Sequence, residues 1–194
     1  NDLKLAEAFA NNLYNVVPTT QHNWNDRTNR SWALSGSCDE AYNKFNDYNS
    51  VTINSGALTP DNAFEFDIWK PTYATIQNCN IFLSRIDDVP GDEAWRNRLK
   101  GEVLFLRAYA YFKLTNDYGG VPLITEPFDL NSDFKVDRST YDQSVDFIVA
   151  ELDKAADLLP LTAPILGRAT KGAALAIKSR ILLYAASPQW NTSN

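Results

Sequence analysis

Methionine is absent from this chain of 194 residues, histidine occurs once and cysteine occurs twice. The one histidine, His22, lies among asparagine and tryptophan residues, a setting more typical of a surface or ligand-contacting residue than of a general base. No serine or cysteine lies in a nucleophile-elbow sequence. Adjacent carboxylates such as Asp87-Asp88 point apart on a helix and are usually solvated. We therefore expect no enzyme, no cofactor and no metal site.

Long apolar runs are also missing, and so is any excess of basic residues. No uninterrupted apolar run approaches the ~20 residues that a membrane-spanning helix needs. Acidic residues outnumber basic ones by 24 to 18, which gives a net charge of −6 and argues against a nucleic-acid-binding protein. The chain does not begin with methionine and shows no signal-peptide pattern, so we expect processed or truncated material.

The two cysteines, Cys38 and Cys79, have no metal-binding spacing. If the protein is exported, a disulfide between these two cysteines can form. Cys79, however, lies in a helical pattern beside Ile76 and Phe82, where a small buried thiol is the simpler interpretation. We favour two thiols over a disulfide.

Helical periodicity is strongest in the stretch that ends at Gly119-Gly120. Its apolar residues recur at spacings of three and four, which places them on one face of a helix. They are Leu99, Val103, Leu106, Ala110 and Leu114. The pattern predicts a central helix over residues 93–118, which the two glycines and Pro122 end.

Four further segments have helical periodicity, and one long segment has none. The helical segments are residues 3–17 with Asp2 as N-cap, about 66–88, 139–159 with Ser139 and Asp142 as a cap, and 170–187 with Thr170 as N-cap. Residues 19–62 form a long loop after the first helix in this prediction. The sequence therefore predicts an all-α protein with antiparallel helix hairpins.

Four stretches in register resemble the SusD/RagB family, the surface nutrient-binding lipoproteins of Gram-negative bacteria. They are Trp69–Asn80, Glu102–Ile124 (EVLFLRAYAYFKLTNDYGGVPLI), Gly167–Ala174 and Leu182–Pro188. The resemblance covers most of residues 60–190. It implies degenerate tetratricopeptide-like hairpins, and a single SusD-like N-terminal domain over residues 1–194 of a longer chain.

The resemblance also implies a function. A SusD-like protein would capture a glycan or oligosaccharide and pass it to a SusC-like TonB-dependent transporter, without catalysis. It would lie on the extracellular face of the outer membrane, held by a lipid anchor outside this sequence. Two alternatives stay open: a peptide-capturing RagB-like protein, and a tetratricopeptide-like scaffold that docks only proteins.

The composition of the 19–62 loop predicts the ligand site. Aromatic rings stack on the apolar faces of sugars, while amides, carboxylates and guanidinium groups hydrogen-bond the hydroxyls. The expected ligand-binding residues are Trp24, Asn25, Asp26, Arg27 and Trp32. In the alternative interpretation, Trp24 and Trp32 cover the helical core and the asparagines satisfy the loop backbone. The stacking platform would then come from the C-terminal half of the longer chain, beginning at Trp190.

Overall fold

The computed structural model describes residues 2–17, 38–39, 49–62, 68–129, 131 and 134–191. The chain divides into two compact units, one of Asn1–Pro18 with Pro71–Asn194 and one of Thr19–Lys70. Over the described residues the regular secondary structure is entirely helical, which confirms the predicted all-α class. None of the helices in these ranges is long and apolar enough to cross a membrane.

The unit of Thr19–Lys70 contains a short helix, α3 (Asn49–Asn54). The sequence prediction placed only loop here, because six residues are too few to show a helical period. After α3 the chain turns: Asn62 accepts a hydrogen bond from the Thr59 amide (2.7 Å) and donates one to the Ala57 carbonyl (3.0 Å). Most of the predicted 19–62 loop lies outside the described residues.

The central helix of the other unit is α5 (Glu93–Tyr118), which matches the prediction. Asp92 caps its N-terminus by accepting a hydrogen bond from the Trp95 amide at 2.7 Å. Gly119 follows its last turn with φ of 72°, a left-handed conformation that favours glycine. All five residues of the predicted apolar stripe are completely buried. The periodicity therefore identified the true inner face of α5.

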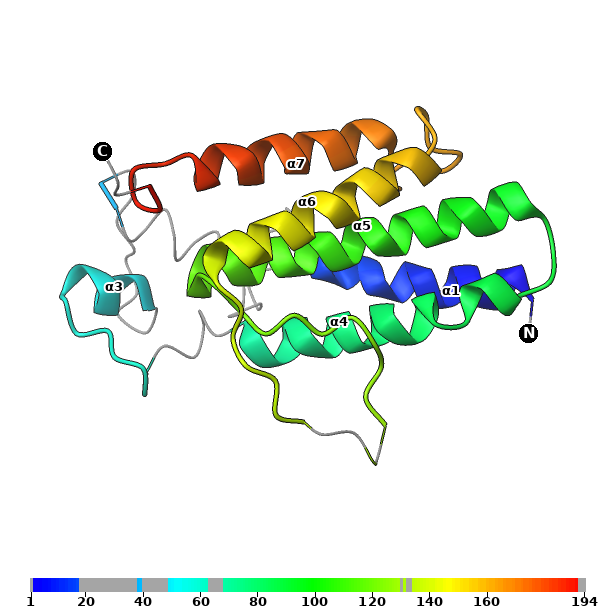
Figure 1. The fold of residues 1–194 in the computed structure, drawn as a ribbon. Coiled ribbons are helices and arrows are strands. Elements are labelled where there is room, and N and C mark those ends of the chain that lie inside the picture. The colour runs from blue at the N-terminus through cyan, green and yellow to red at the C-terminus, as the bar shows by residue number, and fades with distance from the viewer. Residues whose placement is uncertain are drawn as a thin grey trace. The chain divides into compact units, whose positions relative to one another are not determined.

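Two helices pack against α5 in antiparallel succession. They are α6 (Tyr141–Leu158) and α7 (Lys171–Ala185), and Figure 1 shows the chain reversing direction from α5 to α6 and again to α7. Gly101 brings α5 and α6 close, because a Cβ atom there would lie 2.9 Å from Cβ of Leu158. These helices form the predicted antiparallel hairpins.

The N-terminal helix, α1 (Leu3–Leu13), packs against α5 and continues into a 3₁₀ turn, Tyr14–Val16. Asp2 is its N-cap, as predicted. Not every apolar residue of the predicted helical segment 3–17 faces the core, because Leu5 is 64% exposed. Phe9, also exposed, stacks on Phe82 of α4 (Trp69–Leu83), with 6.1 Å between ring centroids.

Two predicted helix details were wrong. The α4 helix ends at Leu83, and Ile86–Asp88 is a separate 3₁₀ turn. The N-cap of α6 is Thr140, which forms a capping box with Gln143, so Ser139 and Asp142 do not cap this helix. Such errors arise because neighbouring Ser, Thr and Asp residues offer several equivalent caps.

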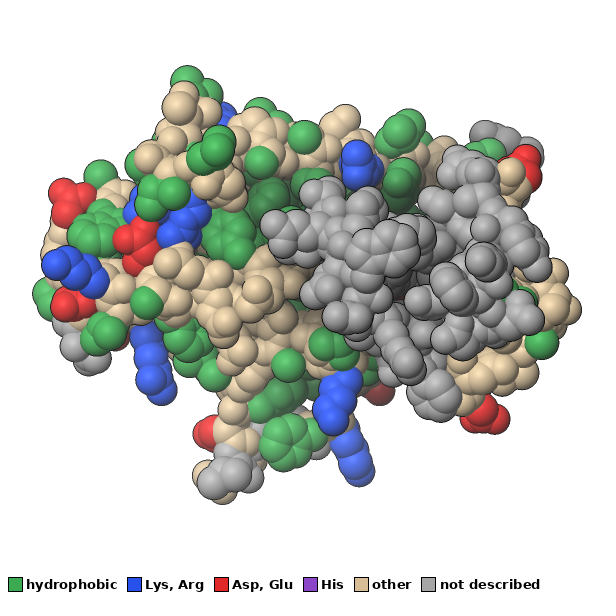
Figure 2. Space-filling model, turned by 180° about the vertical axis from the view of Figure 1, so that it is seen from behind, with side chains coloured by type: hydrophobic (Ala, Val, Ile, Leu, Met, Phe, Trp, Pro, Cys, Tyr) green, Lys and Arg blue, Asp and Glu red, His purple; other side chains and the backbone are tan. Residues whose placement is uncertain are grey.

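The side of α7 that faces the other helices is only partly buried. Ala174 and Ile181 are buried, whereas Tyr184 is exposed. The ring of Tyr184 stacks on the ring of Phe112, with 6.0 Å between the ring centroids. The opposite side of α7 carries exposed leucines at positions 175, 182 and 183. Figure 2 shows hydrophobic side chains along the upper edge of the molecule, where α7 lies. The α7 helix therefore presents an apolar outer face.

A cluster of charged side chains ties α1 to the segment before α7. Glu102 of α5 is completely buried and accepts hydrogen bonds from Arg98 (2.5 Å) and Arg168 (2.7 Å). The same two arginines contact Glu7 of α1. Burial lowers the pKa of Arg98, but the hydrogen bonds to Glu7 and Glu102 outweigh it, so the pKa is raised overall. Each buried charge has a partner, as burial requires.

We expect the replacement Leu106→Ala to lower the free energy of unfolding by about 2–5 kcal/mol, because it leaves a cavity in a fully buried site. The exposed Leu5 offers a matched control, and Leu5→Ala should change stability by less than about 0.5 kcal/mol. Chemical denaturation measures both. Equal effects of the two substitutions would show that the assignment of inner and outer faces is wrong.

Candidate ligand-binding site

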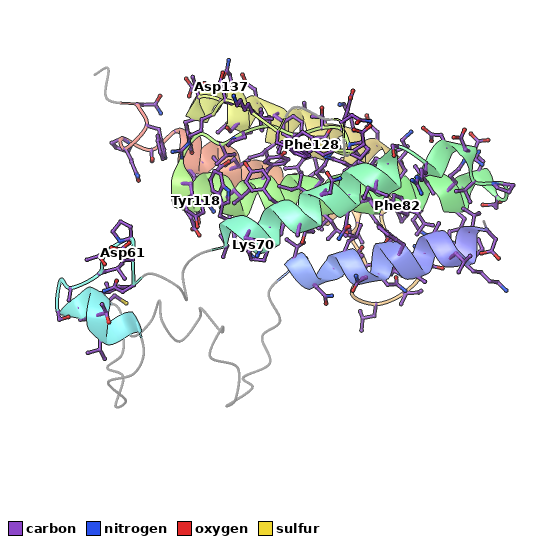
Figure 3. All side chains as sticks on the ribbon, turned by 90° about the horizontal axis from the view of Figure 1, so that it is seen from below. Asp61, Lys70, Phe82, Tyr118, Phe128 and Asp137 are labelled. Atoms are coloured by element: carbon purple, nitrogen blue, oxygen red, sulfur yellow. The ribbon has the colours of Figure 1, made fainter. Side chains whose placement is uncertain are left out.

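A segment without helix, residues 122–128, runs beside α4 and is held there by side chains of that helix; we call it the strap. Tyr73 donates a hydrogen bond from its hydroxyl to the Pro122 carbonyl (2.8 Å). The amide of Gln77 donates to the Phe128 carbonyl and accepts from the Phe128 amide, both at 3.2 Å. Figure 3 shows Phe128 beside α4. Hydrogen bonds at both ends therefore fix the strap.

The middle of the strap is held by groups of the core. Asn80 donates to the Ile124 carbonyl at 2.9 Å, and the Tyr111 hydroxyl donates to the same carbonyl and accepts from the Ile124 amide. Burial raises the pKa of Tyr111 to about 12, so its hydroxyl stays protonated and can make both contacts. Asn80 also accepts from Arg107 (2.8 Å), which is paired with Glu151. The strap thus satisfies polar groups that the helices bury.

The chain enters the strap through a tight turn, Gly119-Gly120. A Cβ atom on Gly120 would lie 2.1 Å from the Ser139 carbonyl oxygen, so only glycine permits this approach. The Ser139 amide donates to the Val121 carbonyl at 3.2 Å. Arg138 donates to the carbonyls of Gly120 (2.8 Å) and Tyr118 (2.5 Å) at the end of α5, where the helix dipole favours a cation. Glycine therefore lets the end of α5 and the start of α6 lie together.

A pocket of about 600 Å³ opens at this junction. Its wall comes from the last turn of α5, the start of α6, and Gln189 and Trp190, which follow α7. The rings of Tyr141 and Trp190 stack with 3.7 Å between centroids and 6° between planes. Tyr118 and Asp137 lie toward this end of the helices in Figure 3. The pocket joins aromatic surface to polar groups from three segments.

The charged side chains in the pocket wall are Asp117 and Arg138. Burial raises the pKa of Tyr141, and the negative charge of Asp142 raises it further. Among the described residues, the wall contains no histidine, cysteine or lysine. Nowhere in the described part of the chain do three side chains of metal-binding type come together. These side chains can stack on and hydrogen-bond a ligand, which is chemistry suited to binding.

The structure does not test the sequence-based choice of site residues. The predicted contacts Trp24, Asn25, Asp26, Arg27 and Trp32 all lie outside the described residues. Trp190 does line a pocket, as the alternative prediction allowed.

Tyr141 was missed because its spacing fits the inner stripe of α6, and nothing in the sequence shows its contact with Trp190.

The Cys79 thiol fits the expectation of a buried side chain. It is completely buried and makes no disulfide, and burial raises its pKa to about 12. Cys38 is exposed. Cys79 is therefore a core residue with little thiolate near neutral pH.

Comparison with known proteins confirms the predicted resemblance. A SusD-like family described as "Starch-binding associating with outer membrane" matches residues 3–183. The SusD-like protein P25 of Formosa agariphila is 34% identical over 119 residues, covering 59% of this chain and 22% of that protein. The chain therefore spans less than a quarter of this curated relative.

Solved structures with the same fold are also SusD-like. A SusD-like protein of Bacteroides fragilis superposes with a TM-score of 0.82 at 31% identity, over 94% of this chain and 35% of that one. A laminarin binding SusD-like protein gives a TM-score of 0.79 at 24% identity, over 98% and 42% of the two chains. The second likeness, at this identity, shows the fold alone.

The Gly119-Gly120 turn generates a stability prediction. Gly120→Ala should lower the free energy of unfolding by about 1–3 kcal/mol, because its Cβ collides with the Ser139 carbonyl. Gly172, in the first turn of α7, is a matched control, because a Cβ there meets nothing closer than 3.8 Å. Gly172→Ala should stabilise by about 0.5–1 kcal/mol. Urea denaturation of both variants checks the signs, and a neutral or stabilising Gly120→Ala would contradict the close approach.

Proposed function

The chain belongs to the SusD-like family of outer-membrane-associated starch-binding proteins, and from this we propose that it captures glycans or oligosaccharides at the cell surface. The captured ligand passes to a SusC-like TonB-dependent transporter. A lipid anchor outside this sequence holds the protein on the extracellular face. The observation that carries the proposal is the family match, which extends over residues 3–183.

The character of the described side chains supports binding without catalysis. The pocket beside Gly119-Gly120 offers a stacked aromatic pair and polar side chains, and the part of its wall that the structure describes holds no histidine, cysteine or lysine. The loop residues Trp24, Asn25, Asp26, Arg27 and Trp32 remain proposed ligand contacts, on their composition alone.

One observation favours a second function, that of a tetratricopeptide-like scaffold that docks proteins. Leu175, Leu182 and Leu183 leave an apolar face of α7 exposed. Exposed apolar surface of this kind is common at protein interfaces. Peptide capture, as in RagB-like proteins, is the other alternative. Both predict a ligand made of amino acids in place of a sugar.

Incubation of the purified protein with a panel of neutral polysaccharides, acidic polysaccharides and peptides tests the proposal. We expect calorimetric titration to detect binding of at least one polysaccharide. Chromatography of the incubated mixtures should detect no shortened products. Binding of peptides with no binding of any polysaccharide would support the alternatives.

Two further results would change parts of the proposal. Polysaccharide turnover that survives repurification would show that the protein is an enzyme. The same titration on Trp24→Ala and Trp32→Ala tests the loop contacts: a true stacking platform should lose about thirtyfold in affinity. Variants that bind normally but melt early would show that these tryptophans belong to the core.

A further inference from the structure

We propose that the pocket at the C-terminal end of α5 is a sugar-binding subsite, in which an uncharged pyranose ring stacks beside Tyr141 on the indole of Trp190. This inference rests on the proposed glycan-binding function and adds a location and a ligand class. It depends only on residues 116–120, 138–141 and 189–190.

The aromatic pair is held in place before any ligand arrives. Trp190 lies in a turn in which its own amide and that of Asn191 both donate to the Ser187 carbonyl, at 3.1 and 3.2 Å. The Asn191 side chain donates to the Ala185 carbonyl at 2.5 Å, which fastens this turn to the end of α7. Parallel stacking on Tyr141 then fixes the plane of the indole. A ring fixed in this way loses little conformational entropy on binding.

The indole is also open to a ligand. Trp190 is 36% exposed although one face of its ring is stacked on Tyr141. The absence of a side chain at Gly119 lets the ring edge approach the backbone, since a Cβ there would lie 3.3 Å from the indole. An aromatic side chain that is positioned by packing and still borders a pocket is the arrangement that stacks on an apolar sugar face.

Uncharged polar groups line the pocket beside the ring. Asn116 and Gln189 carry amides, and Thr140 carries a hydroxyl; all three residues are exposed. An amide side chain both donates and accepts hydrogen bonds, so it matches a sugar hydroxyl, which does the same. The Thr140 hydroxyl accepts from the Gln143 amide and keeps its own hydrogen for donation. The wall thus matches a polyhydroxylated ligand.

The local charge argues against an anionic sugar. Arg138 is the one cation among the described lining residues, and its guanidinium already donates to the carbonyls of Tyr118 and Gly120. Asp117 lies in the same wall, and Asp137 and Asp142 directly flank lining residues in the sequence. The wall itself holds one carboxylate and one cation, and the flanking Asp137 and Asp142 add negative charge beside it. A sulfate or uronate group would meet repulsion here, whereas a neutral hexose would not.

Titration calorimetry with maltohexaose, laminarihexaose and an alginate hexasaccharide tests the inference. We expect at least one neutral hexasaccharide to bind more tightly than the alginate. Trp190→Ala should lower the affinity for that neutral hexasaccharide by about tenfold or more, as expected for an aromatic side chain that anchors a ligand. Trp190→Phe, which keeps a flat ring, should retain most of the affinity. Phe134→Ala removes a 65% exposed aromatic side chain outside the pocket and should change nothing.

Thermal melts of each variant serve as the control, because an unchanged melting temperature shows that a loss of affinity does not come from unfolding. Neutral-glycan binding that Trp190→Ala leaves unchanged would overturn the subsite and leave the proposed function intact. Tighter binding of alginate than of both neutral sugars would overturn the ligand class. Failure of the unmodified protein to bind any of the three and any polysaccharide of the larger panel would overturn the proposed function and the subsite together.

Discussion

The ion pair between Arg107 and Glu151 is the constraint on which the rest of the helical unit depends. Both side chains are buried, and removing two charges from water is costly unless each is paired and hydrogen-bonded. Arg107 meets this demand by donating to Glu151 of α6, to Asn80 of α4 and to the Thr125 carbonyl of the strap. Four segments of the chain must therefore take fixed positions around one guanidinium group.

This arrangement links the core to the candidate site. Only Val121 separates the Gly119-Gly120 turn from the strap, so the hydrogen bonds that hold the strap also limit the conformations open to the turn. The close approach of Gly120 to Ser139 then places the start of α6, with Tyr141, beside the end of α5. A ligand pocket whose walls are set by the core in this way is preorganised, and preorganisation reduces the entropic cost of binding.

Local sequence was enough to predict α5 and two of the helix caps, because apolar spacing and a single Asp or Thr decide them. It could not predict the ion pair, since Arg107 and Glu151 are 44 positions apart and look like ordinary charged residues on helices. The partner of Trp190 was hidden for the same reason. Leu5 shows the opposite error: its spacing fits the helical apolar pattern of residues 3–17, but its side chain is exposed to water. Contacts between distant segments, which only the fold creates, explain these differences.

A double-mutant cycle on Arg107→Met and Glu151→Met tests the central role of the ion pair most directly. Each single variant leaves one buried charge without its buried ion-pair partner and should lose about 3–5 kcal/mol in free energy of unfolding. The double variant should lose much less than the sum, because neither charge remains. Lys154→Met, which removes the exposed contact to Glu151, should cost less than about 1 kcal/mol. Additive losses in the double variant would contradict the account.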